Sequence, residues 1–191
     1  MVEGPAAPAP LAAPELGDGV VTLRVPGPGD ILDIVAACQD PQTARWTRVP
    51  NPYRRADAES FVAAQEGNRA AGTDLVLLSF RPQAQRPFIG AVGLHGIGHG
   101  DAELGYWTAP WARGEGLTQR AVRLAVGHAF TDVGLDRISW CALVGNDASR
   151  RLAERVGFRI AGTLRHATLT PGRRGDMWVG DLLPEDLART R

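Results

Sequence analysis

The chain has 191 residues, and its 21 lysines and arginines balance its 21 aspartates and glutamates, so its formal net charge is zero. A neutral chain has no overall electrostatic attraction to nucleic acid or to an anionic membrane, so neither is expected as a partner. No apolar run approaches the roughly 18 residues that span a bilayer. The length suits one domain with a sizeable core.

The first 18 residues are rich in proline and alanine, which is typical of a flexible tail. They lack the basic start and the continuous apolar stretch of a signal peptide. We therefore predict a tail over residues 1–18, a single domain over residues 19–191 and a cytoplasmic protein. The two cysteines, Cys38 and Cys141, lie far apart in apolar segments, so we expect reduced, buried thiols rather than a disulfide or a metal pair.

The first half of the chain alternates strand and helix patterns. Residues 20–25 carry β-branched side chains and predict a first strand. Helices are predicted from Asp30 to Cys38 and over residues 57–66, and the proline-rich segment between them is expected to be irregular and to face the substrate. Residues 74–80 and 87–95 predict a hairpin, and residues 102–108 a third antiparallel strand.

The second half continues with a helix over residues 117–130 and an apolar strand over residues 137–144. A short capped helix is predicted at residues 146–156, and two closing strands at residues 159–169 and 176–183. The order β-α-α-β-β-β-α-β-α-β-β, with no internal repeat, predicts one mixed α/β domain.

The segment PWARGEGLTQRAV, residues 110–122, places Gly114 and Gly116 directly before a predicted helix. Small residues at such a position let backbone N–H groups close on an anion at the positive end of the helix, although a plain tight turn has the same glycine spacing. The dinucleotide fingerprint is incomplete because Gln119 stands where its third glycine belongs, and a P-loop ending is missing. Arg113 and Thr118 would add side-chain donors.

The same window resembles the coenzyme A pyrophosphate turn of the GNAT superfamily of acyl-CoA-dependent N-acyltransferases, Gln/Arg-x-x-Gly-x-Gly/Ala. Its first position holds Trp111, and the longer stretch GYWTAPWARGEG resembles the branch of bacterial ribosomal-protein N-terminal acetyltransferases. NDASRRLAERVGF resembles that branch's helix after the fifth strand, while LRVPGPGD and RWTRVPNPY resemble its opening strand and acceptor loop. The resemblance covers about residues 20–187.

This resemblance implies a mostly antiparallel sheet of six to seven strands, flanked by about four helices and splayed between its fourth and fifth strands, Glu103–Thr108 and Ile138–Val144. The pantetheine arm of the coenzyme would bond to the splayed edges as a peptide strand does. Acetyl-CoA or another acyl-CoA is the implied co-substrate. Its expected ligands are Trp107, Thr108, Arg113, Gly114, Glu115, Gly116, Leu117, Thr118, Asn146 and Ser149.

Transfer of an acyl group from a thioester to an amine requires a neutral amine and a stabilised leaving thiolate. Glu103 is the first candidate for the base, acting directly or through water, with a solvated edge carboxylate as the alternative. Ser149 matches the family serine near the thioester sulfur, and its other role would be helix capping. Tyr106 is the alternative acid or a core tyrosine, and Asn146 can bond the pantetheine and cap the helix at once.

The expected acceptor is a primary amine that contacts Trp46, Tyr53 and His166. A protein α-amino group, a small amine or antibiotic, and a succinyl donor in place of acetyl all stay open. Two hypotheses from other functional classes also stay open. One is a non-catalytic acyl-CoA-binding sensor, and the other is an interaction protein that forms a homodimer through the late strands. No metal is expected, because glycines flank His95 and His99 and no glutamate completes a zinc motif.

Overall fold

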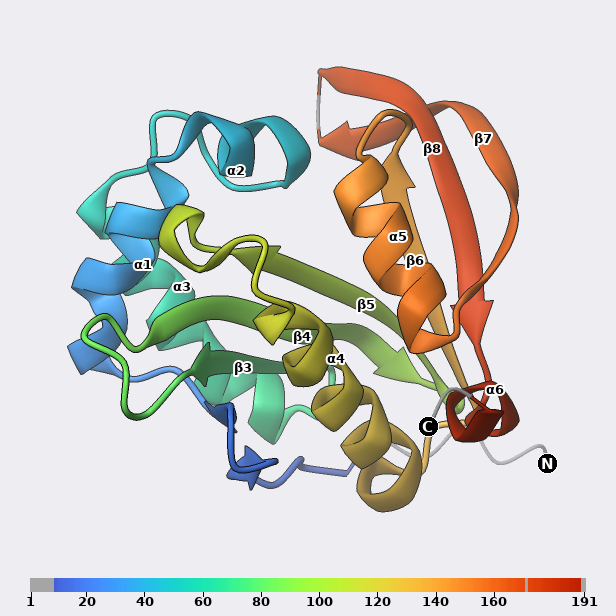
Figure 1. Ribbon diagram of the computed structural model, residues 1–191, viewed down its shortest axis with the longest axis horizontal. Helices are drawn as coiled ribbons and strands as arrows, with labels where there is room; N and C mark the ends of the chain where they lie inside the picture. Colours follow the sequence, from blue (N-terminus) through green and yellow to red (C-terminus); the bar gives the residue numbers. More distant parts are fainter. Residues whose placement is uncertain (1–8, 171, 190–191) are drawn as a thin grey trace, which may run out of the picture.

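The computed structural model describes residues 9–170 and 172–189 and contains one eight-stranded sheet of order β1-β2-β3-β4-β5-β6-β8-β7 (Figure 1). All neighbouring strands are antiparallel except β5 and β6. The predicted mixed fold is thus confirmed. The strands are β1 (Leu16–Gly17), β2 (Thr22–Arg24), β3 (Asp74–Phe80), β4 (Phe88–Gly98), β5 (Asp101–Thr108), β6 (Arg137–Leu143), β7 (Arg159–Thr170) and β8 (Arg173–Leu182).

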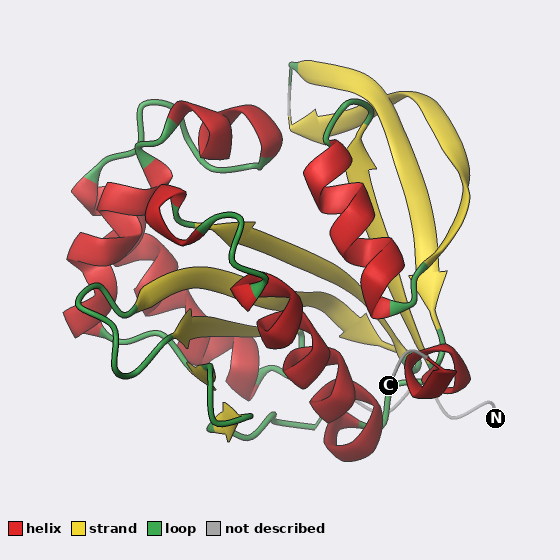
Figure 2. Ribbon diagram, in the orientation of Figure 1, coloured by secondary structure: helices red, strands yellow, loops and turns green. Residues whose placement is uncertain are grey.

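Six α-helices are described, which is two more than the sequence predicts (Figure 2). They are α1 (Ile31–Cys38), α2 (Pro41–Trp46), α3 (Arg55–Ala70), α4 (Leu117–His128), α5 (Asp147–Val156) and α6 (Pro184–Arg189). The additional α2 lies in the segment that we expected to be irregular. Its first turn forms because the Asp40 side chain accepts a hydrogen bond from the Thr43 N–H and Pro41 occupies a first-turn position. None of the described helices is long and apolar enough to span a bilayer.

The ordered domain begins before residue 19. Residues 1–8 of the predicted tail lie outside the described residues, but Leu16 and Gly17 form β1 and pair with β2. The Leu11 N–H donates to the carbonyl of Arg69, whose guanidinium donates back to the Leu11 carbonyl. Leu11, Leu16 and Gly17 are therefore hydrogen-bonded to the rest of the domain.

The sheet has a hydrophobic core on each face because strand side chains alternate between the two faces. On one face, Leu75, Leu94 and Leu104 pack against α4 and α5. On the other, Val76 and Leu78 pack against α1 and α3. Figure 1 shows α4 in front of the sheet and α3 behind it.

The parallel pair β5 and β6 separates partway along its length. Backbone pairing runs from Asp101 opposite Arg137 to Leu104 opposite Trp140, and the residues that follow in either strand have no partner in the other. The two ribbons diverge toward α2 on one side and α5 on the other (Figure 1). This divergence is the predicted splay between the fourth and fifth strands, counted without the short β1.

Candidate active site

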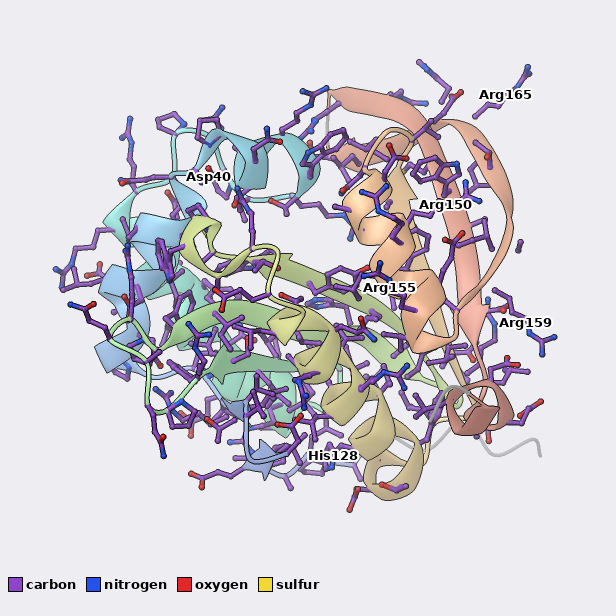
Figure 3. The ribbon with its side chains drawn as sticks, in the orientation of Figure 1. Asp40, His128, Arg150, Arg155, Arg159 and Arg165 are labelled. Atoms are coloured by element: carbon purple, nitrogen blue, oxygen red, sulfur yellow. The ribbon has the colours of Figure 1, made fainter. Side chains whose placement is uncertain are left out.

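A cavity of about 1450 Å³ occupies the divergence of β5 and β6. Its lining comes from both faces of the sheet, with Glu103 and Gly105 on the face of α3 and Leu104 and Tyr106 on the face of α4. Figure 3 labels Asp40 between α1 and α2 and Arg155 on α5, the elements that flank the divergence on its two sides. The cavity therefore passes through the sheet from one face to the other.

One end of the cavity reaches the start of α4, where the helix has no side-chain cap. The two preceding glycines have left-handed φ angles, 83° at Gly114 and 74° at Gly116. A Cβ added at either would meet no protein atom within 4 Å. By contrast, α2 and α5 are capped by Asp40 and Asn146. The free first-turn N–H groups of α4 and its dipole thus point to an open space that suits an anion.

The polar side chains around this turn have partners within the protein. The hydroxyls of Thr108 and Thr118 lie 2.6 Å apart and join the end of β5 to the first turn of α4. Arg113, which we expected to donate to the pyrophosphate, donates to Asp40 at 2.5 Å and to the Thr43 hydroxyl at 3.1 Å. It still lines the cavity. Glu115 pairs with Arg81 at 2.5 Å and does not belong to the lining.

Tyr106 and Ser149 form a hydrogen-bonded pair at the α5 side of the divergence. The Tyr106 hydroxyl donates to the Ser149 carbonyl at 2.9 Å, and the Ser149 hydroxyl donates to the Tyr106 oxygen at 3.0 Å. Burial raises the pKa of Tyr106 to about 12, so the phenol stays protonated at neutral pH. Capping of α5 belongs to Asn146, whose side chain accepts from the Ser149 N–H. The Ser149 hydroxyl therefore does not cap the helix.

Glu103 lies on the opposite face, and 39% of its side chain is exposed. Its Oε1 accepts a hydrogen bond from Arg48 at 3.1 Å and lies 3.6 Å from the Cys141 thiol. Burial and the nearby Glu103 carboxylate raise the pKa of Cys141 to about 11, so this thiol is neutral. Both cysteines are free.

Of the three residues expected to contact the acceptor, two line the cavity and one does not. Trp46, at the end of α2, and the buried Tyr53 both line the cavity. His166 does not. It lies exposed on β7 with a φ of 53°, and its backbone N–H donates to Asp176 within the β7–β8 hairpin. The described residues also hold no cluster of three or more histidine, cysteine or acidic side chains arranged to bind a metal.

Two further contacts at or beside the site were not predicted, because each joins groups that are remote in sequence. Arg173 at the start of β8 donates to the carbonyls of Ala44, Arg45 and Thr47 at the end of α2. Asp74, the first residue of β3, accepts a hydrogen bond from His95 Nδ1 at 2.9 Å inside the cavity. The hairpin of β3 and β4 contains the signal for the second contact, since an in-register pairing of residues 74–80 with 87–95 places these two residues opposite each other.

Comparison with known proteins agrees with this geometry. A family model described as an acetyltransferase (GNAT) domain matches residues 21–159. The putative ribosomal N-acetyltransferase YdaF of Bacillus subtilis (strain 168) is 34% identical over 99 residues, which make up 51% of this chain and 54% of that protein. The matches thus span about half the length of the curated relatives.

Solved structures share the whole fold. Mycobacterium smegmatis RimJ, in complex with CoA-disulfide, has a TM-score of 0.79 at 23% identity and covers 92% of this chain and 88% of its own. Spermidine N-acetyltransferase from Vibrio cholerae, in complex with CoA and spermine, has a TM-score of 0.75 at 23% identity, with 90% and 99% covered. At these identities the likeness concerns the arrangement of the elements.

Proposed function

Because the chain belongs to the GNAT acetyltransferase family, we propose that it transfers an acetyl group from acetyl-CoA directly to a primary amine. The observation that carries this proposal is the cavity through the sheet. It joins the uncapped start of α4, suited to a pyrophosphate, with the unpaired edges of β5 and β6, suited to the pantetheine amides.

In this proposal the coenzyme lies on the α4 and α5 side. The N–H groups of Gly114, Gly116 and Leu117 bind the pyrophosphate, with Thr118 and the backbone near Trp107 and Thr108 beside it, and Asn146 faces the pantetheine. The thioester then lies at the point where β5 and β6 separate. The Tyr106 and Ser149 hydroxyls on that side are the donors for the departing thiolate, and their mutual hydrogen bonds keep them oriented.

The amine enters from the side of Trp46 and Tyr53, opposite the coenzyme. Glu103 takes a proton from the ammonium, directly or through water, and the neutral amine attacks the thioester carbonyl. The new C–N bond forms as the C–S bond breaks, and the thiolate receives its proton from the Tyr106 and Ser149 pair. The second proton, which the amide nitrogen loses as the C–N bond forms, passes through water and restores the proton of that pair. Arg48 holds the Glu103 carboxylate toward the cavity.

A protein α-amino group is the favoured acceptor, supported by the relatives whose names describe ribosomal N-acetyltransferases. A small polyamine is the second candidate, supported by the spermidine acetyltransferase of the same fold. We also infer a cytoplasmic location, because Cys38 and Cys141 are free thiols as in reducing compartments. Homodimerisation is proposed through β7, the edge strand of the sheet, where Leu164 is 55% exposed.

Release of free CoA tests the activity. The protein is mixed with acetyl-CoA and with a peptide carrying a free N-terminus, the same peptide N-acetylated, or spermidine. All 21 cationic side chains are arginines, so no lysine amine of the protein itself adds background. We expect CoA release with the free peptide and none with its N-acetylated form. Tight binding of acetyl-CoA without release in any mixture would instead identify an acyl-CoA-binding sensor.

A further inference from the structure

Four polar side chains stand in one row across the sheet, and three of them, Asp74, His95 and Glu103, line the cavity. Backbone pairing places Asp74 of β3 opposite His95 of β4, His95 opposite Glu103 of β5, and Glu103 opposite Ser139 of β6. Residues that face each other across neighbouring strands point to the same face of the sheet. This polar row therefore lies on the face of α3, where the amine is proposed to enter.

The His95 ring lies against the sheet. A Cβ added at Gly93 would come within 2.4 Å of His95 Nε2, and one added at Gly105 within 3.4 Å of the same atom. The two glycines, which face each other on β4 and β5, thus leave the room that the imidazole occupies. Gly105 directly follows Leu104, the last residue of β5 that pairs with β6, so the ring reaches the point where these two strands separate.

Asp74 sets the chemistry of this ring. Its Oδ1 lies 2.9 Å from His95 Nδ1, and an ionised carboxylate only accepts hydrogen bonds, so the hydrogen of the neutral imidazole sits on Nδ1. Nε2 then carries a lone pair and serves as a base. The pair has the arrangement of a base oriented by a carboxylate, and 43% of the His95 side chain is open to the cavity and solvent.

The Glu103 carboxylate has two polar neighbours of its own within the protein. Its Oε1 already accepts from Arg48 and lies beside the Cys141 thiol. Side chains directly opposite on neighbouring strands have Cβ atoms about 5 Å apart, so two long polar side chains in these positions can meet directly or through one water. A proton that reaches Glu103 thus has a neighbouring acceptor in His95.

We propose that His95, held by Asp74, is the final acceptor of the proton that the ammonium loses, an inference that rests on the proposed acetyl transfer. The ammonium N–H bond breaks and the proton passes by way of Glu103 or water to His95 Nε2. The freed amine forms the C–N bond while the thioester C–S bond breaks. The imidazolium then returns its proton to solvent through the open cavity.

The test compares pH profiles of variants with intact acetyl-CoA binding. The charged and titratable groups that line the cavity on the elements around His95 include Asp74 on β3, Glu103 on β5, Cys141 on β6, Asp57 on α3, and Arg48 and Tyr53 before α3. We expect His95→Gln to lower kcat about 10²-fold, to leave KM for acetyl-CoA unchanged and to move the acidic limb of kcat/KM between pH 5.5 and 9. Asp74→Asn is expected to lower kcat less, because the ring remains.

The matched control is His128→Gln. His128 also pairs with an aspartate, Asp132, with its Nδ1 3.1 Å from Oδ2, but it lies at the far end of α4, outside the cavity lining (Figure 3). Its rate and pH profile are expected to stay at wild-type values. In His95→Ala, free imidazole should restore part of the rate, since the space above Gly93 and Gly105 opens. A purely structural His95 predicts no such rescue.

Two outcomes separate this inference from the proposed function. If the wild-type protein turns over and His95→Gln has the same kcat and the same acidic limb, the role of His95 is overturned while the proposed acetyl transfer stands. Absence of turnover by the wild-type protein with every amine overturns the acetyl transfer, and the role of His95 with it.

Discussion

Gly116 ends the turn before α4 with a left-handed φ of 74° and open space where a side chain would stand. We expect Gly116→Val to weaken CoA binding at least about tenfold, because the side chain crowds the phosphates and the backbone leaves its left-handed conformation. Calorimetry on folded protein measures the change.

Gly134 provides the control for this prediction. It has a φ of 77° and equally open surroundings, and it ends the turn after α4, outside the cavity. Gly134→Val carries a similar backbone strain, so it is expected to lose stability while keeping its CoA affinity. Equal CoA affinity in both variants would contradict the anion cradle.

Ser149 is the second residue whose role can be measured directly. Because Asn146 caps α5, Ser149→Ala removes a hydroxyl from the cavity without removing the cap. We expect kcat to fall roughly 10²-fold with KM for acetyl-CoA nearly constant, as for a donor used only in the transition state. Unchanged kcat, or a loss of helical circular dichroism that accounts for the lower rate, would exclude that role.

Among single residues, the sequence predicts the site residues that belong to a short continuous motif. The glycine turn, Tyr106 and Ser149 belong to continuous segments, and all line the cavity. The partners of Arg113 and Glu103 were not predicted, because Asp40 and Arg48 reach them from another part of the chain. Arg113 illustrates the difference, since local chemistry favours a phosphate ligand and the fold gives it a carboxylate.

Helix α2 is one of the elements that were not predicted, and its last residue, Trp46, lines the cavity on the proposed acceptor side. Pro41 at its first position and Pro50 beyond its end favour an irregular segment. Pro41 is nevertheless compatible with a first helical turn, and Asp40 supplies the cap. Arg113 contacts Asp40 and Thr43 at its start, and Arg173 contacts three carbonyls at its end. Long-range contacts of this kind hold a six-residue helix that would not persist alone.

We therefore expect Arg173→Met to loosen α2 without unfolding the domain. KM for the amine should rise several-fold, amide hydrogen exchange over residues 41–47 should accelerate, and the affinity for CoA should stay unchanged. Arg174→Met removes the neighbouring exposed arginine of β8 and serves as the control. Equal exchange in the two variants would show that Arg173 does not hold the helix.

The longer strands could be predicted from the sequence because their apolar pattern reflects the cores that they face. The runs that became β3 to β6 alternate or are continuously apolar because they face two cores, and that pattern is visible in the sequence. The two-residue β1 has no such pattern. Its pairing depends on β2, which holds it at the edge of the sheet.

For the whole molecule, alkaline pH probes the buried acidic groups. Burial raises the pKa of Cys38 to about 12 from the usual 9.0, and that of Tyr106 to about 12 from 10.0. The unfolded chain loses these protons first, so the stabilisation is complete below about pH 9 and is lost as the pH rises toward 12. All cationic side chains are arginines, so no lysine titrates in this range.

We expect the free energy of unfolding in urea to decrease from pH 9 to 10.5, and to decrease less steeply in Cys38→Ala. If the free energy of unfolding falls equally with pH in the two proteins, the pKa of the Cys38 thiol is the same in the folded and the unfolded chain. Measurement at pH 7.5 supplies the reference, because the Cys38 thiol and the Tyr106 phenol are both protonated there in the folded and the unfolded chain.

The passage of the cavity through the sheet has a kinetic consequence. If the acyl donor binds on the α4 and α5 side and the amine on the α3 side, as proposed, each product would have its own exit, and neither would have to wait for the other. Free CoA would then compete with acetyl-CoA but not with the amine, so raising the amine concentration would not relieve its inhibition. Variation in the α2 and α3 segments could likewise change which amine is acetylated without disturbing the donor side.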